Sequence, residues 1–263
     1  MKCSNPKIIN LKVPPYIMKV GCGKCTGCRV DRAAMWSNRL MDELRYWPCA
    51  SFITLTYDDD HLPEDHLLLK SDLQNFFKRL RKNTGLKIKY FACGEYGENN
   101  GRPHYHAILF GISSAHRSII SSSWNMGRTQ SGTVTHASCR YVADYISKID
   151  GVQAQANWGP DKNKWPFKVQ SNGLGLKYVE DNLEKLEQMR YYDTKNGIHI
   201  PIPGYYRKKA KLQMNKEDIK YLESVNIENI NKRKESGTDY FDMLQNNAQH
   251  LEAKMNMKKK GKL

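Results

Sequence analysis

The chain has 263 residues and a mass of 30.4 kDa, enough for one sizeable core with appendages. Hydrophobic residues make up 40% of it, which argues against disorder throughout, and the formal net charge of +15 favours nucleic acid as a partner. No run approaches the roughly 20 apolar residues that a membrane helix needs, so we expect no membrane association.

Residues 1–30 are predicted to form an irregular arm, because three prolines and a glycine-rich stretch interrupt any periodicity. The glycines surround the run Cys22-Gly-Lys-Cys25-Thr-Gly-Cys28. This spacing suits a thiolate metal site, with structural Zn²⁺ and plain reduced thiols as the alternatives and Cys3 as a further candidate ligand. Seven cysteines, an odd number, argue against a disulfide framework and favour a reducing compartment.

Hydrophobic periodicity predicts alternating helices and strands after this arm. In order they are a helix from Val30 to before Pro48, a strand over Ser51–Tyr57, a helix from Lys70 or Ser71, strands over 86–96 and 103–112, a short helix after Ser113, a strand over 129–135 and a helix over 137–149. The polar, glycine-containing segment 97–102 predicts a hairpin between two adjacent antiparallel strands. We therefore expect an α+β fold, with an antiparallel central sheet flanked by helices.

The pattern weakens beyond residue 150, where prolines and glycines interrupt it and a helix is indicated over 177–189. Residues from 216 onward are charged and helix-prone, and they end in a basic tail at 258–262. The sequence thus predicts three parts: a Cys-rich arm (1–30), a core (31–150) and a C-terminal extension (151–263).

A candidate metal site lies in the predicted hairpin. His104 and His106 are two residues apart on one strand and so project from the same face. The preceding strand ends near two carboxylates, of which Glu95 lies within the strand pattern and Glu98 in the loop; either could complete the site. Two imidazoles and a carboxylate suit Mg²⁺ or Mn²⁺ acting on a phosphoryl oxygen, although Zn²⁺ or Fe²⁺ would also fit.

Candidate nucleophiles lie on the predicted helix over 137–149, where Tyr141, Tyr145 and Lys148 share one stripe. Tyrosines four residues apart usually only pack in a core, but a phenolate is also a competent nucleophile. Charge and hydrogen bonding from Lys148 would lower a tyrosine pKa and favour Tyr145 as the first to attack.

Three segments in this order resemble the motifs of rolling-circle replication initiators of the HUH endonuclease superfamily: 52–57, 102–111 and 141–148. With the cysteine run and Gly94-Glu-Tyr-Gly97, they look like the replication-associated proteins of gokushovirus-type microviruses, small phages with circular single-stranded DNA. The likeness covers roughly residues 20–150. Tyr105 departs from the family's aliphatic residue between the histidines, and we expect it to turn to the opposite face of the strand.

The resemblance implies an RRM-like HUH core whose histidines bind Mg²⁺ or Mn²⁺. It implies an endonuclease that nicks and rejoins single-stranded DNA at a phage origin, through a 5'-phosphotyrosine and a free 3'-OH primer. Implied partners are circular single-stranded DNA and the host's helicase and DNA polymerase, in the host bacterial cytoplasm. The alternatives are a non-catalytic DNA-binding or packaging protein and a metal-dependent phosphohydrolase.

Overall fold

The computed structural model describes residues 3–10, 17–97, 101–148, 151–188, 192–193, 199–200 and 202–210, and positions 249, 250, 253 and 257. The chain divides into two compact units, one of Ala33–Asp181 and one of Met1–Arg32 with Asn182–Leu263. Among the described residues, no helix combines the length and the apolar character that a bilayer span requires.

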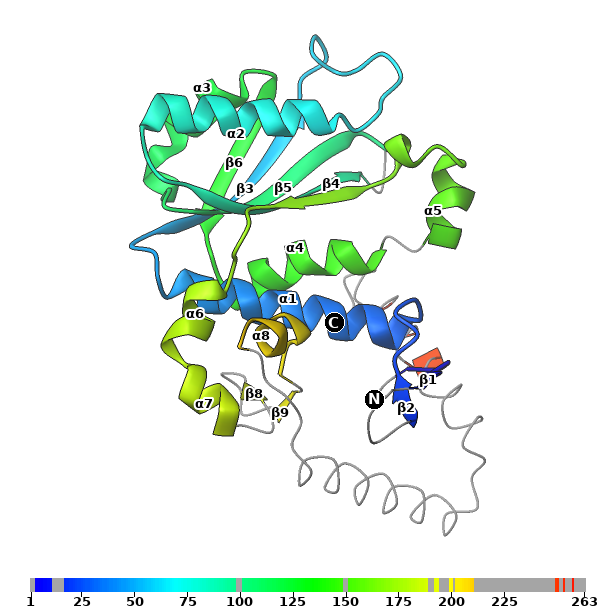
Figure 1. The fold of residues 1–263 in the computed structure, drawn as a ribbon. Coiled ribbons are helices and arrows are strands. Elements are labelled where there is room, and N and C mark those ends of the chain that lie inside the picture. The colour runs from blue at the N-terminus through cyan, green and yellow to red at the C-terminus, as the bar shows by residue number, and fades with distance from the viewer. Residues whose placement is uncertain are drawn as a thin grey trace. The chain divides into compact units, whose positions relative to one another are not determined.

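A five-stranded sheet forms the centre of the Ala33–Asp181 unit (Figure 1). Its strands are β3 (Ala50–Tyr57), β4 (Lys89–Tyr96), β5 (Pro103–Phe110), β6 (Gly127–Thr133) and β7 (Phe167–Gln170). They lie in the order β6-β3-β5-β4-β7, and every neighbouring pair is antiparallel. The predicted antiparallel sheet is confirmed, with β5 at its centre.

Helices α2 (Lys70–Thr84) and α3 (Arg117–Trp124), the latter preceded by η1 (Ser114–His116), cover one face of this sheet (Figure 1). The predicted stripe of α2 is buried there, and its members are Leu73, Phe76, Phe77 and Leu80. The helix ends where Gly85 adopts a φ of 64° and its N–H bonds to Arg81 O, a left-handed cap that glycine adopts without strain.

Helices α1 (Thr26–Leu44), from Ala33 on, and α4 (His136–Lys148) cover the opposite face (Figure 1). Leu40 of α1 and Val142 of α4 pack in one buried cluster with side chains of β4 and β5. Strand β5 is therefore covered on both faces, which explains its almost continuous run of apolar residues.

The remaining described elements are short. The same unit contains α5 (Gly151–Trp158), η2 (Lys162–Lys164) and α6 (Leu176–Asp181). The other unit contains β1 (Lys7–Asn10), β2 (Ile17–Val20), α7 (Leu183–Gln188), β8 (Tyr192–Asp193), β9 (His199–Ile200) and α8 (Gly204–Lys209). The basic tail at 258–262 lies outside the described residues.

Three sequence expectations need correction. The N-terminal arm is not wholly irregular, because β1 and β2 pair antiparallel within it and α1 begins at Thr26 rather than Val30. The compact unit continues past residue 150 to Asp181, because β7 adds a strand beside β4. The helix predicted over 177–189 is two short helices, α6 and α7.

Candidate active site

The hairpin of β4 and β5 brings together the three predicted metal ligands. Antiparallel pairing sets Glu95 opposite His104 and Cys93 opposite His106, so alternate residues of both strands face α4. The predicted hairpin is confirmed, and Gly97 N donates to Arg102 O at its end, at 3.0 Å. Glu98 lies outside the described residues.

The side chains of this group, named here the Glu-His-His cluster (Glu95, His104 and His106), converge on one point. Glu95 Oε1 lies 2.9 Å from Nε2 of each histidine. One ligand atom from each residue falls within 4.8 Å of the others. Burial raises the pKa of Glu95, but hydrogen bonds from both histidines outweigh burial and lower that pKa below its ordinary value.

The second ring nitrogen of each histidine is also held. His104 Nδ1 donates to Arg102 O at 3.1 Å, and His106 Nδ1 lies 2.9 Å from Thr54 Oγ1 of β3. Such outer partners fix the orientation of metal-binding imidazoles. Thr54 was not predicted from the sequence as a site residue, although its place on the same face of a neighbouring strand was a usable signal.

These contacts test whether the cluster fits a cation. A carbonyl oxygen only accepts, so the proton of a neutral His104 sits on Nδ1 and its Nε2 presents a lone pair to the Glu95 carboxylate. Two acceptors 2.9 Å apart need a proton or a cation between them. Two imidazole nitrogens and one carboxylate oxygen make a suitable donor set for Mg²⁺, Mn²⁺, Zn²⁺ or Fe²⁺.

The two predicted tyrosines of α4 lie beside this cluster and contact each other. Tyr145 OH donates to Tyr141 OH at 2.7 Å, and Tyr141 OH lies 3.5 Å from His106 Nε2. The Tyr145 ring stacks on the His106 ring at 5.9 Å, whereas the Tyr141 ring meets it edge-on at 5.1 Å. The helix thus brings both phenols to the predicted metal ligands.

The two phenols differ in exposure. Tyr141 is 43% exposed and Tyr145 only 8% exposed. Burial, the hydrogen bond to Tyr141 and the charge of Glu95 all raise the pKa of Tyr145. Tyr145 therefore stays protonated as a donor. Lys148 ends the same helix, but its side chain lies outside the described residues.

Tyr105, between the two histidines, turns to the opposite face of β5 as expected. It is fully buried, and its hydroxyl lies 2.7 Å from that of Tyr57 and accepts from Leu69 N at 3.0 Å. Tyr57 OH in turn donates to Asp72 Oδ2 at 2.8 Å. Burial raises the pKa of Tyr105 to about 12, so this hydroxyl is a structural group.

The other predicted metal site lies in the other unit. Cys22, Cys25 and Cys28 lie together there, and Cys3 joins them, with the four Sγ atoms all within 4.8 Å of one another. All seven cysteines of the chain are free thiols.

Comparison with known proteins gives a consistent result. A family model described as replication-associated protein ORF2 matches residues 50–150, a stretch that runs from β3 to the end of α4 and holds every residue of the Glu-His-His cluster and both tyrosines. Three curated relatives, from two phages and a Spiroplasma virus, are likewise described as replication-associated proteins.

Replication-associated protein VP4 of Bdellovibrio phage phiMH2K is 28% identical over 253 residues, covering 85% of this chain and 79% of the relative. Replication-associated protein ORF2 of Spiroplasma virus 4 is 31% identical over 247 residues, covering 83% and 73%. Replication-associated protein ORF4 of Chlamydia phage 1 is 27% identical over 219 residues, covering 74% and 54%. No solved structure matches the chain significantly.

Proposed function

This chain belongs to the replication-associated proteins of microviruses, and on that premise we propose that it nicks and rejoins viral single-stranded DNA through a tyrosine nucleophile. The observation that carries the proposal is the position of the Tyr141 hydroxyl, 3.5 Å from His106 Nε2 in the Glu-His-His cluster. A nucleophile beside a set of metal ligands is the arrangement that phosphoryl transfer by covalent catalysis requires.

In this proposal the Glu-His-His cluster holds Mg²⁺ or Mn²⁺, which when bound would polarise a phosphoryl oxygen of the DNA. The chain's own residues set the geometry. Glu95, His104 and His106 face α4 from adjacent strands, and Thr54 and the Arg102 carbonyl fix the two rings. The scissile phosphate then lies between this cluster and the exposed phenol of Tyr141.

The reaction is a transesterification. The Tyr141 oxygen forms a bond to phosphorus, the bond from phosphorus to the 3' oxygen breaks, and the leaving oxygen takes a proton. The phenol proton is lost on the exposed side of Tyr141, and Lys148 is the predicted group that stabilises the phenolate. The products are a 5'-phosphotyrosine and a free 3'-OH, and attack by a 3'-OH reverses the step and rejoins the strand.

The geometry favours Tyr141 as the first nucleophile, whereas the sequence argument from Lys148 favoured Tyr145. Tyr141 is exposed, and it accepts the hydrogen bond that stabilises a phenolate. Tyr145 is buried and is the donor of that bond. Because the two hydroxyls lie 2.7 Å apart, a small movement of the Tyr141 side chain brings Tyr145 to the same phosphate for a second attack.

The biological role that follows is initiation of rolling-circle replication at a phage origin in the host bacterial cytoplasm. The free 3'-OH would prime the host's DNA polymerase. The sequence has no Gly-x-x-x-x-Gly-Lys phosphate loop, so we assign unwinding to a host helicase.

The decisive experiment is capture of the covalent intermediate. Incubation with circular single-stranded viral DNA and Mn²⁺ should yield a protein–DNA adduct that survives a denaturing gel, with the protein on the 5' side of the cut. The double variant Tyr141→Phe/Tyr145→Phe should give none. Tyr90→Phe is the matched control, because Tyr90 lies on β4 but its ring stacks on Phe77 at the opposite face of the sheet.

Other outcomes separate the alternatives. Cutting without an adduct would indicate a phosphohydrolase with water as the nucleophile. Binding without cutting would indicate a DNA-binding or packaging protein. An adduct with the double variant would place the nucleophile elsewhere.

A further inference from the structure

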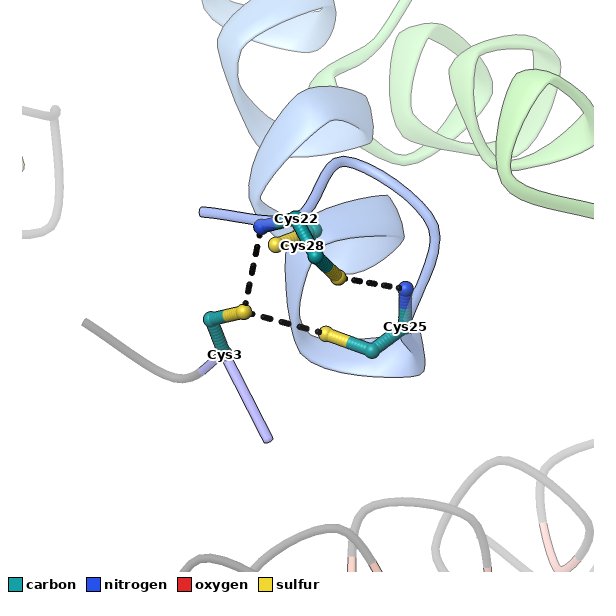
Figure 2. Close-up of side chains that lie close together, drawn as sticks. All are labelled: Cys3, Cys22, Cys25 and Cys28. Carbon is teal, nitrogen blue, oxygen red and sulfur yellow. Dashed lines mark hydrogen bonds between the residues drawn. The ribbon is translucent and has the colours of Figure 1, made fainter. Parts of the chain in front are cut away.

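Four cysteines of the N-terminal unit point toward one another in a group named here the four-cysteine cluster: Cys3, Cys22, Cys25 and Cys28 (Figure 2). The Sγ atoms of Cys3 and Cys25 are 3.7 Å apart. None of the four forms a disulfide. This convergence has no part in the DNA chemistry proposed above and needs its own explanation.

The run from Cys22 to Cys25 folds as a turn whose amides face sulfur. Lys24 N and Cys25 N lie 3.4 and 3.3 Å from Cys22 Sγ, and both donate to it. Gly23 adopts a φ of 76°, which a side chain would strain. N–H groups directed at a sulfur favour the thiolate over the thiol.

The first turn of α1 supplies the next pair of sulfurs. The helix begins at Thr26, so Cys25 directly precedes it and Cys28 lies within its first turn. A helix N-terminus carries partial positive charge, which stabilises nearby thiolates. Gly21 lets the backbone pass close by, because a Cβ there would lie 2.9 Å from Cys28 Sγ.

Cys3 comes from a distant part of the sequence and completes the cluster. Pairing of Lys7 in β1 with Val20 in β2 folds the N-terminus back toward the start of α1. Cys22 N then donates to Cys3 Sγ at 3.2 Å. Cys3 is only 2% exposed, so its sulfur is directed into the cluster and away from water.

The distances fit a tetrahedral ion. Zinc–sulfur bonds of about 2.3 Å place the corners of a tetrahedron about 3.8 Å apart, and the sulfurs of the cluster need only a small closure to reach that. Four thiolates held together without an ion would repel one another, whereas Zn²⁺ neutralises half of their charge.

We infer that the four-cysteine cluster binds one Zn²⁺ ion, which ties the N-terminal hairpin to the first turn of α1. Binding releases the proton of each coordinating thiol. Four protein ligands fill the coordination sphere and leave no position for water or substrate, so the ion is structural. The site therefore differs in purpose from the Glu-His-His cluster.

The test is metal analysis of the full chain purified without chelator, in a His104→Ala/His106→Ala background that removes the other candidate site. We expect about one zinc per chain, by the stoichiometry of a Cys₄ site. Replacement by Co²⁺ should give the intense thiolate-to-cobalt absorption of a tetrahedral sulfur site. The four thiols should resist alkylation until a chelator removes the ion.

Single substitutions make the test specific. Cys25→Ser should lower the zinc content strongly, whereas Cys3→His should retain zinc because imidazole replaces thiolate in many zinc sites. Cys49→Ser is the control, since Cys49 lies outside the cluster and should leave zinc unchanged. The Cys3→His variant keeps the proposal testable if the serine variant fails to fold.

Several results would overturn the inference. They are absence of metal with all four thiols reactive, a disulfide between Cys3 and Cys25 in peptide maps of protein kept from air, iron in place of zinc, or full zinc content in a Cys22→Ser/Cys25→Ser variant.

Discussion

The Glu-His-His cluster and the four-cysteine cluster bring metal-ligand side chains together in opposite ways. The first takes its members from two adjacent strands of a sheet and lies beside an exposed phenol. The second closes four sulfurs around one point at the start of a helix. Three ligands leave coordination positions open for substrate, whereas four fill a tetrahedron. The contrast shows how one chain can separate chemistry from structural support.

The largest expected effect comes from Glu95→Gln, which removes the negative ligand with little change in volume. Loss of several kcal/mol of Lewis-acid stabilisation should slow nicking by about a thousandfold or more. Binding of single-stranded DNA, measured by fluorescence anisotropy, should change little, and the zinc content should stay the same. If the zinc content also fell, the two clusters would not be independent.

The tyrosines should differ from each other next. We expect Tyr141→Phe to reduce adduct formation about a hundredfold, because the buried Tyr145 must then replace it. Tyr145→Phe should cost about tenfold, the value of one hydrogen bond to the attacking oxygen. Single-turnover adduct formation on a short origin oligonucleotide measures both. The reverse order would restore Tyr145 as the first nucleophile.

A smaller effect should separate the outer support of the two clusters. Thr54→Val removes the hydroxyl that lies 2.9 Å from His106 Nδ1 but keeps the side-chain volume. The Mn²⁺ concentration for half-maximal nicking should rise about tenfold, and excess Mn²⁺ should restore the rate. Thr56, on the same face of β3, donates instead to Arg128 O, so Thr56→Val serves as the control. Equal effects of both variants would indicate a general disturbance of the strand.

The smallest effect on catalysis should come from Tyr105→Phe. Its hydroxyl is buried on the far face of β5, bonded to Tyr57 and Leu69. Losing it should lower the free energy of unfolding by about 1–2 kcal/mol and leave nicking unchanged in protein that remains folded. Urea unfolding together with adduct assays would check this, and a large catalytic loss in folded protein would contradict it.

The sequence predicted most of the core because its strands and helices have strong local patterns. The two-residue spacing of the histidines on β5 and the four-residue spacing of the tyrosines on α4 each fixed a shared face. Their mutual approach needed the sheet order and the packing of α4, which spacing alone does not give. The resemblance to a known family supplied that arrangement in advance.

The elements that were missed have weak local signals. Strand β7 has four residues, directly follows Pro166, and joins the sheet by pairing with β4, a strand far earlier in the sequence. Strands β1 and β2 are equally short, and α1 begins with Gly27 in its first turn, which lowers helix propensity. Such segments are set by long-range pairing that a local pattern does not contain.

The central place of β5 also decides which parts of the proposed active site can move. Both edges of β5 are hydrogen-bonded, to β3 and to β4, so the amides of the two histidines should exchange with deuterium only when the whole sheet opens. The tyrosines belong to a helix that packs on the sheet through side chains alone. Any adjustment to a bound DNA strand should therefore fall to α4, which would swing its nucleophiles over a fixed bed of ligands.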